Sequence, residues 1–181
     1  SVAPRRSTSL AKESTASSTR SIARSTIFSG AIGSMRVSAG KYVPLWFGHV
    51  LSFYARGEVV DAYGDTEEVP LSDRLYLGGG RTMRGFEYRD VGPKAVRRDA
   101  APDDDYHRPI GGSSLALGTV EYSLPIHPEV RAIRFAAFYD IGNVWADPYE
   151  YDFDRMASSA GLGIRFDIRE FPMRFDYGWA L

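Results

Sequence analysis

The sequence predicts an all-β protein built on an antiparallel sheet, and two observations carry this prediction. Apolar and polar residues alternate along six runs, and period-two alternation is the pattern of a strand with one apolar and one polar face. The chain of 181 residues also contains 18 glycines and 13% aromatic residues, which is more typical of β proteins than of helical enzymes. The six expected strands are 31–40, 51–59, 117–124, 133–142, 160–167 and 173–179.

Residues 1–29, before the first expected strand, differ in composition from the rest. Thirteen of them are Ser or Thr, five are Lys or Arg, and Glu13 is the only acidic one. Such a segment buries too little apolar surface to fold by itself, so we expect a flexible Ser/Arg-rich loop or tail over residues 1–29. An organellar transit peptide has a similar composition. The structured part is expected over residues 30–181, and the absence of an initial Met suggests a piece of a longer protein.

The overall composition disfavours several classes of protein. The chain has 22 basic and 23 acidic side chains, whereas a nucleic-acid-binding protein shows a basic excess, so no nucleic-acid partner is expected. There is no cysteine, which removes disulfides and thiolate metal sites. No run approaches the ~18 apolar residues that a membrane-spanning helix needs.

The connections between the expected strands alternate in length. Short turns containing proline are expected at 43–47, 125–129 and 169–172, and long polar loops at 64–112 and 145–158. Short turns on one side and long loops on the other are typical of outer-membrane β-barrels, and strands of about ten residues match a tilted span. A soluble β-sandwich also alternates apolar and polar residues, so it remains an alternative.

Two details favour the barrel over the sandwich. Charges of both signs recur on the polar faces, as in a wet and packed lumen: Arg56, Glu58, Glu121, Arg134, Asp140, Arg165, Asp167, Arg174 and Asp176. Aromatic residues assigned to the apolar face lie toward strand ends, where membrane-interface girdles occur. These aromatic residues are Tyr42, Tyr122, Tyr139 and Trp179.

The most unusual stretch, LYLGGGRTMRGFEYRDVGP at 75–93, lies in the longest loop. It contains a glycine turn (Gly78, Gly79, Gly80), then Met83, Arg84, Gly85 and Phe86, and then Gly92 and Pro93. This order resembles the loop motif of the BamA superfamily, outer-membrane barrels that insert or translocate other proteins. Met83 stands where the family usually has Val. The segments 118–126, 138–145, 159–168 and 173–181 resemble the strands that follow this loop in the family.

The resemblance implies a fold and a role for each motif residue. The chain would be the C-terminal part of a transmembrane β-barrel, about six antiparallel strands with one loop returning into the lumen, lacking the first half and the last strand. Family members place this arginine against acidic residues of the next two strands; by strand parity, Glu121 and Asp140 share the polar face, so both are expected partners of Arg84. Gly85 would adopt a backbone conformation closed to other residues, and Phe86 would pack against the barrel wall.

The function that the resemblance implies is that of a non-enzymatic outer-membrane protein assembly factor, which helps other β-barrel proteins to fold and insert. A protein-translocating barrel of the same superfamily (two-partner secretion or autotransporter assembly) and a passive pore or surface antigen are the alternatives. The implied partners are outer-membrane lipids, unfolded β-barrel clients, accessory assembly lipoproteins and the protein's own periplasmic repeat domains. The implied location is the outer membrane of a Gram-negative-type bacterium.

Other motifs do not point to chemistry. Met83 occupies the third glycine position of a dinucleotide-binding fingerprint, and no Gly-Lys-Ser/Thr follows the glycine turn. The run 103–105 (three Asp) lacks the spaced ligands of a calcium loop, and the three histidines are far apart in sequence: His49, His107 and His127. We therefore expect no catalytic residue, no metal and no cofactor.

Overall fold

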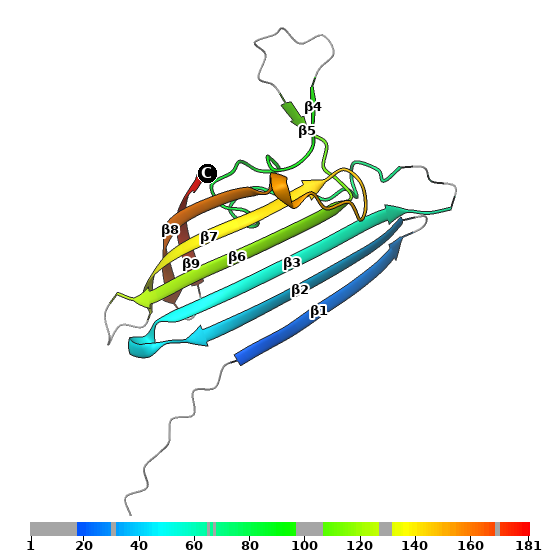
Figure 1. Cartoon of the computed structure of the whole chain (residues 1–181). Coiled ribbons are helices and arrows are strands. Elements are labelled where there is room, and N and C mark those ends of the chain that lie inside the picture. The colour runs from blue at the N-terminus through cyan, green and yellow to red at the C-terminus, as the bar shows by residue number, and fades with distance from the viewer. Residues whose placement is uncertain are drawn as a thin grey trace, which may run out of the picture.

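Seven antiparallel strands form one curved open sheet (Figure 1). The computed structural model describes residues 18–29, 32–64, 66, 68–96, 107–126, 132–168 and 171–181. In sheet order the strands are β1 (Ser18–Ser29), β2 (Ile32–Pro44), β3 (Val50–Ala62), β6 (Ser114–Pro125), β7 (Ile133–Trp145), β8 (Ala157–Ile168) and β9 (Phe171–Ala180). The all-β antiparallel prediction is confirmed, and every strand in the sheet pairs with its neighbour in the order of the chain.

The N-terminal strand corrects one expectation. We expected a flexible tail over residues 1–29, but residues 18–29 form β1, which pairs with β2 from Ser18 opposite Tyr42 to Ser29 opposite Ile32. That expectation is wrong for these twelve residues, and the sheet has seven strands rather than about six. The physical reason is that β2 offers a row of backbone donors and acceptors, which a polar segment satisfies as well as an apolar one. Residues 1–17 lie outside the described part.

The elements described in the remaining connections are short. The β2–β3 turn holds the single 3₁₀ turn η1 (Trp46–Gly48), and the loop after β7 holds η2 (Phe153–Arg155). Inside the long loop, β4 (Lys94–Val96) pairs with β5 (His107–Pro109) as a separate small ladder. No helix among the described residues is long and apolar enough to cross a membrane.

The pairing register keeps the two faces of the sheet separate across β2 to β9. Arg36 lies opposite Glu58, Thr119 opposite Asp140, and Asp140 opposite Ser159, so the polar faces of neighbouring strands coincide. This polar side is the inner face of the sheet. The opposite, outer face exposes large apolar side chains, as a lipid-facing barrel wall does. They are Met35, Val37, Phe53, Val120, Tyr139, Leu162, Phe175, Tyr177 and Trp179.

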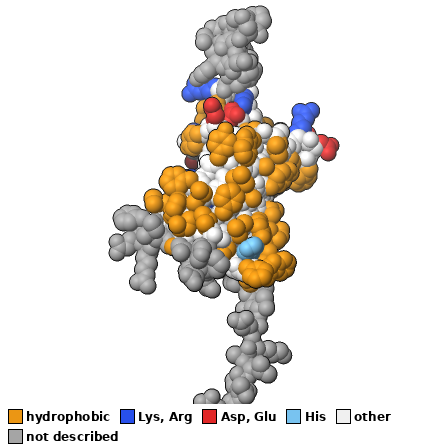
Figure 2. Space-filling model, turned by 90° about the vertical axis from the view of Figure 1, so that its left-hand side faces the viewer, with side chains coloured by type: hydrophobic (Ala, Val, Ile, Leu, Met, Phe, Trp, Pro, Cys, Tyr) orange, Lys and Arg blue, Asp and Glu red, His pale blue; other side chains and the backbone are white. Residues whose placement is uncertain are grey.

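Tyr42 is on the other face from the one we expected. It pairs with Ser52, and Ser52 pairs with Glu121, so Tyr42 belongs to the inner face. Its even position in β2 already matches Arg36 and Ser38 rather than Met35 and Val37, so its parity contradicted the assignment to an apolar girdle. Hydrophobic side chains do dominate the side of the molecule shown in Figure 2, the side on which η1 lies, where Trp46 and Phe47 are exposed.

The long loop between β3 and β6 packs on the inner face and brings its own apolar residues. A buried cluster joins three loop residues to three wall residues: Leu77, Met83 and Val91 with Leu115, Leu117 and Val144. Isolated bridges from Leu75 to Gly112 and from Leu77 to Val91 hold the loop together. The loop is therefore seated by apolar packing as well as by polar contacts.

Candidate functional site: an ion-pair network under the loop motif

The glycine turn begins the motif and has the tight geometry that its sequence requires. Gly78 and Gly79 have φ of 116° and 93°, and a Cβ on Gly78 would lie 2.5 Å from the carbonyl oxygen of Glu87. The Thr82 hydroxyl donates to the Gly78 carbonyl at 2.8 Å, and the Thr82 amide donates to the Gly79 carbonyl at 3.0 Å. Gly80, by contrast, has open space around its Cβ position. After the turn the chain runs toward the sheet, so that Met83 enters the buried cluster and Arg84 reaches the inner face.

Arg84 makes a bidentate ion pair with Asp140 of β7. Arg84 Nε donates to Oδ2 at 2.8 Å, and Nη2 donates to Oδ1 at 2.7 Å. The backbone amide of Arg84 also donates to Oδ2, at 3.2 Å. A guanidinium is a planar fork that matches a carboxylate in this way, and the charge makes each hydrogen bond stronger than a neutral one. One carboxylate thus holds both the side chain and the backbone of the motif.

The third prong of Arg84 reaches Glu121 of β6 and joins a larger network. Arg84 Nη1 and Arg165 Nη2 both donate to Glu121 Oε2, at 2.7 and 2.8 Å. Arg165 also pairs with Asp176 of β9, whose Oδ2 lies 3.4 Å from Arg174 Nε. Three arginines and three carboxylates therefore alternate across the loop and the four strands β6 to β9.

The two central charges of this network are buried. Asp140 is 0% exposed and Arg84 is 7% exposed, so water solvates neither charge and each depends on its ion-pair partners. The Arg84 guanidinium also lies over the Phe138 ring, 3.5 Å from its centroid. Burial by itself lowers the pKa of Arg84, but the hydrogen bonds to Asp140 and Glu121 outweigh burial and hold that pKa above its ordinary value. Arg84 stays charged and paired.

Gly85 brings the loop backbone against β9. Its φ is +87°, and a Cβ there would lie 3.0 Å from the backbone N and C atoms of Trp179. A Cβ on Gly178 would in turn lie 2.9 Å from the Gly85 nitrogen. Both the conformation and the contact exclude a larger residue. Phe86 follows, half-buried against the cluster of Leu77 and Met83.

The structure brings the predicted residues together, and it adds partners that sequence reasoning did not place. Arg84, Glu121 and Asp140 meet as expected from parity. The register of β8 and β9 adds Arg165 and Asp176, which the sequence places only on the polar face, and β7 adds the ring of Phe138 beneath Arg84. Strand parity assigns Arg165 and Asp176 to this face, but it does not fix their level along the strands. The side chain of Asp167, predicted for the same face, is not described.

The residues considered for metal binding form no site in the described part of the chain. His49 Nδ1 lies at 2.5 Å from the Tyr122 hydroxyl, which ties the β2–β3 turn to β6. The run 103–105 and His127 lie outside the described residues, as does the side chain of His107. Among the described residues, no group of three or more His, Asp and Glu side chains is placed to hold a metal.

Several known proteins are similar in sequence to this chain. The chain is 31% identical over 134 residues to the outer membrane protein assembly factor BamA of Nitratidesulfovibrio vulgaris, covering 74% of this chain and 16% of that protein. It is 33% identical over 107 residues to BamA of Neisseria meningitidis serogroup B, covering 57% and 12%. A SAM50-like protein of Drosophila melanogaster is 30% identical over 139 residues, covering 71% and 27%. The chain thus spans less than a third of the length of these relatives.

A solved structure shares the fold of this chain, and a family model matches its sequence. The crystal structure of BamA from Haemophilus ducreyi lacking POTRA domains 1–3 superposes with a TM-score of 0.68 at 24% identity, covering 83% of this chain and 32% of that one. This likeness shows a shared fold, so the curved sheet is part of a barrel wall. The sequence model of the Omp85 superfamily domain matches residues 17–181, which includes β1 and the whole loop. The chain therefore belongs to the Omp85 superfamily.

Proposed function

We propose that the chain is the C-terminal part of the barrel of an outer-membrane protein assembly factor, which helps other β-barrel proteins to fold and insert. The observation that carries the proposal is the anchoring of the loop motif by Arg84 on Asp140 and Glu121. The names of two relatives above 30% identity, both outer membrane protein assembly factors, support it. The proposed role involves no covalent chemistry and is therefore non-enzymatic.

The anchored loop has a physical consequence for such a role. A loop held inside the barrel by a buried ion pair stiffens the wall formed by β6 to β9, because the ion-pair network that Arg84 joins connects all four strands. Elsewhere in the barrel, a strand edge that opens can then pair with an incoming strand, since an unpaired edge is a template for β-augmentation. The loop thus maintains the rigid half of the barrel while the client strand pairs with the other.

The proposed location and partners follow from this role. The protein acts in the outer membrane of a Gram-negative-type bacterium, with its outer face against lipid. Its clients are unfolded β-barrel proteins, and accessory lipoproteins and its own periplasmic repeat domains deliver them. Nucleic acid has no part in the proposal.

The test uses the complete protein reconstituted in liposomes, with an unfolded β-barrel protein added from urea. Folding of the client is followed by its heat-modifiable mobility on gels. We expect the wild-type protein to accelerate folding and Arg84→Ala to lose most of the acceleration. Arg155→Ala is the control, because Arg155 lies in η2 and its side chain is 86% exposed.

Two outcomes would contradict the proposal. Conductance across the liposome membrane without any acceleration of client folding would identify a passive pore. Delivery of the client into the liposome interior, rather than into the bilayer, would identify a translocating barrel of the same superfamily.

A further inference from the structure

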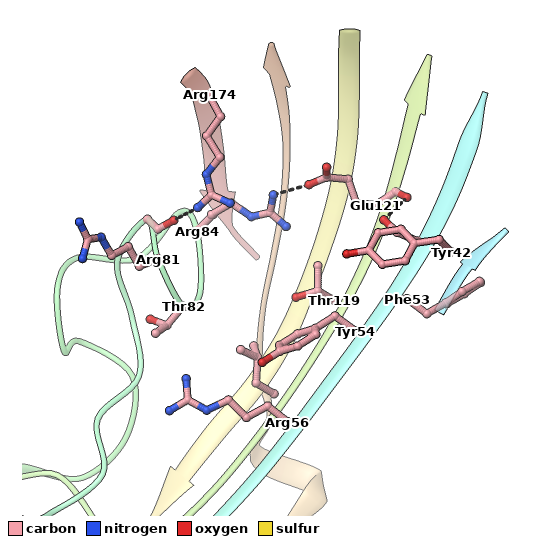
Figure 3. Close-up of a pocket in the computed structure, with 13 residues that line it drawn as sticks. Tyr42, Phe53, Tyr54, Arg56, Arg81, Thr82, Arg84, Thr119, Glu121 and Arg174 are labelled. Carbon is pink, nitrogen blue, oxygen red and sulfur yellow. Dashed lines mark hydrogen bonds and ion pairs between the residues drawn. The ribbon is translucent and has the colours of Figure 1, made fainter. Parts of the chain in front are cut away.

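A cavity of about 320 Å³ separates the glycine turn from the wall formed by β2, β3 and β6 (Figure 3). The turn contributes Gly80, Arg81 and Thr82 on one side, and Arg174 of β9 lies beside them. The wall contributes mainly polar side chains of the inner face: Tyr42, Ser52, Tyr54, Arg56, Thr119 and Glu121. The network under the motif, described above, uses only Arg84, Glu121 and Arg174 of these residues.

The charges around the cavity do not balance. Arg84, Arg165 and Arg174 face three carboxylates, so the network under the motif has no excess charge. On the wall, however, Arg36 and Arg56 share the single carboxylate of Glu58, which is 4% exposed. Arg81 has no partner among the described residues. Arg36, Arg56 and Arg81 thus face one described carboxylate, which leaves an excess of two positive charges: one shared by Arg36 and Arg56, and one on Arg81.

Unused hydrogen-bond donors accompany this charge. Arg56 donates through Nε to Glu58 at 2.6 Å, and its two terminal nitrogens have no acceptor in the described part of the chain. The hydroxyls of Tyr42, Tyr54 and Thr119 likewise make no hydrogen bond to any described residue. Figure 3 shows Arg56 and Tyr54 extending from the wall toward the loop, while Arg81 stands at the rim and points away from the wall. Cationic and hydroxyl donors beside two aromatic rings suit a chain segment that carries carboxylates.

We propose that this cavity binds an acidic segment of an extended polypeptide, with Arg56 as the principal contact and Arg81 at the rim. The inference rests on the proposed function in one respect, that a client polypeptide enters the barrel. It deepens that function by assigning a site on the inner face and a charge preference for the segment held there.

The position and size of the cavity favour a polypeptide over other anions. It lies on the inner face, whereas lipid headgroups would meet the outer face with its exposed apolar side chains. Its volume of about 320 Å³ is many times the roughly 10–15 Å³ that a single water molecule needs, so it has room for an extended group. Its donors come from three wall strands and the loop, so they line a length of chain rather than converging on one atom.

The test measures peptide binding by the complete protein in phosphatidylcholine nanodiscs. The probe is a fluorescein-labelled peptide in which Glu alternates with Thr, and the reference is the same peptide with Gln in place of Glu. We expect the Glu peptide to bind about tenfold more tightly in fluorescence anisotropy. Arg56→Gln should remove this preference, Arg81→Gln should reduce it by about threefold, and Arg56→Lys should retain most of it because the charge remains.

The controls separate this proposal from folding defects and from the assembly function. Arg155→Gln removes the same charge far from the cavity and should bind both peptides like the wild type. In the Arg56→Gln variant, the buried Glu58 carboxylate still has Arg36 as its ion-pair partner. A heat-modifiable band on gels checks that the barrel forms. If both Arg56→Gln and Arg81→Gln leave the preference intact, the proposal is overturned, while acceleration of client folding would still support the assembly function.

Two other outcomes would also overturn it. Displacement of the peptide by inorganic phosphate, beyond that by chloride at equal ionic strength, would identify a phosphate site. Loss of the preference in nanodiscs that contain phosphatidylglycerol would identify a lipid headgroup site.

Discussion

Arg84 and Asp140 are 56 positions apart in the chain, yet two guanidinium nitrogens and the backbone amide of Arg84 all donate to the Asp140 carboxylate. Three hydrogen bonds to one buried group fix the position and the direction of the motif together. The backbone bond matters because it cannot be made by an arginine that merely reaches in from a distant loop. The pair therefore reports that the motif itself is seated on the inner face.

Removing Arg84 should destabilise the protein strongly. Arg84→Ala leaves the Asp140 charge buried without its main partner, which costs about 3–5 kcal/mol in other proteins. We expect the loop at 64–112 to become accessible to protease in the complete protein, with a matching loss in the free energy of unfolding in urea. Arg155→Ala should change neither. A loop equally resistant to protease in the Arg84→Ala variant would refute the anchoring role.

Exchanging the two charges should recover part of this loss. Arg84→Asp and Asp140→Arg each place two like charges together, whereas the double variant restores an ion pair with a different geometry. We expect the double variant to be more stable than the sum of the single losses predicts, with a coupling energy of about 1–3 kcal/mol. Unfolding in urea measures all four corners of this cycle, and strict additivity would show that the two residues do not interact.

Two glycines of the motif should respond differently to the same substitution. Gly85→Ala is strained by its φ of +87° and by the contact with Trp179, so we expect a loss of about 2 kcal/mol or more. Gly80→Ala meets nothing within 4 Å and should stay within about 0.5 kcal/mol of the wild type. Protease resistance of the loop and urea unfolding compare the two. Equal effects would mean that the approach to β9 has no special role.

Replacing either of two serines of the inner face by alanine should change the free energy of unfolding, and the two changes should have opposite signs. The Ser159 hydroxyl is buried with no hydrogen-bond partner among the described residues. Because Ser159→Ala removes a polar group that loses its water on folding and gains no hydrogen bond, it should raise the free energy of unfolding by about 1 kcal/mol. The Ser123 hydroxyl accepts from Arg134 at 3.0 Å, so Ser123→Ala should lower it by about 1 kcal/mol. Urea titrations of the complete protein decide the signs, and a loss of stability in Ser159→Ala would indicate an additional partner there.

Much of the fold was predictable because strand patterns are local. Period-two alternation identified six strands and assigned Glu121 and Asp140 to one face. β1 is not predictable from composition, because residues 18–29 are rich in Ser and Arg, whereas their backbone pairing with β2 does not depend on side-chain type. Tyr42 lies on the inner face for a related reason: its position in β2, and not its aromatic type, sets the direction of its side chain.

The sequence by itself determined which residues alternate, which glycines the motif requires, and that Arg84 would seek acidic partners on the strands after the loop. Only the tertiary structure decided the level at which strands β3 to β9 pair. This register brings Arg165 and Asp176 into the network and leaves Arg56 of β3 facing an open cavity. The reason is physical: side-chain direction follows from the geometry of each residue's own strand, whereas the register between strands depends on the whole sheet and on the loop packed against it.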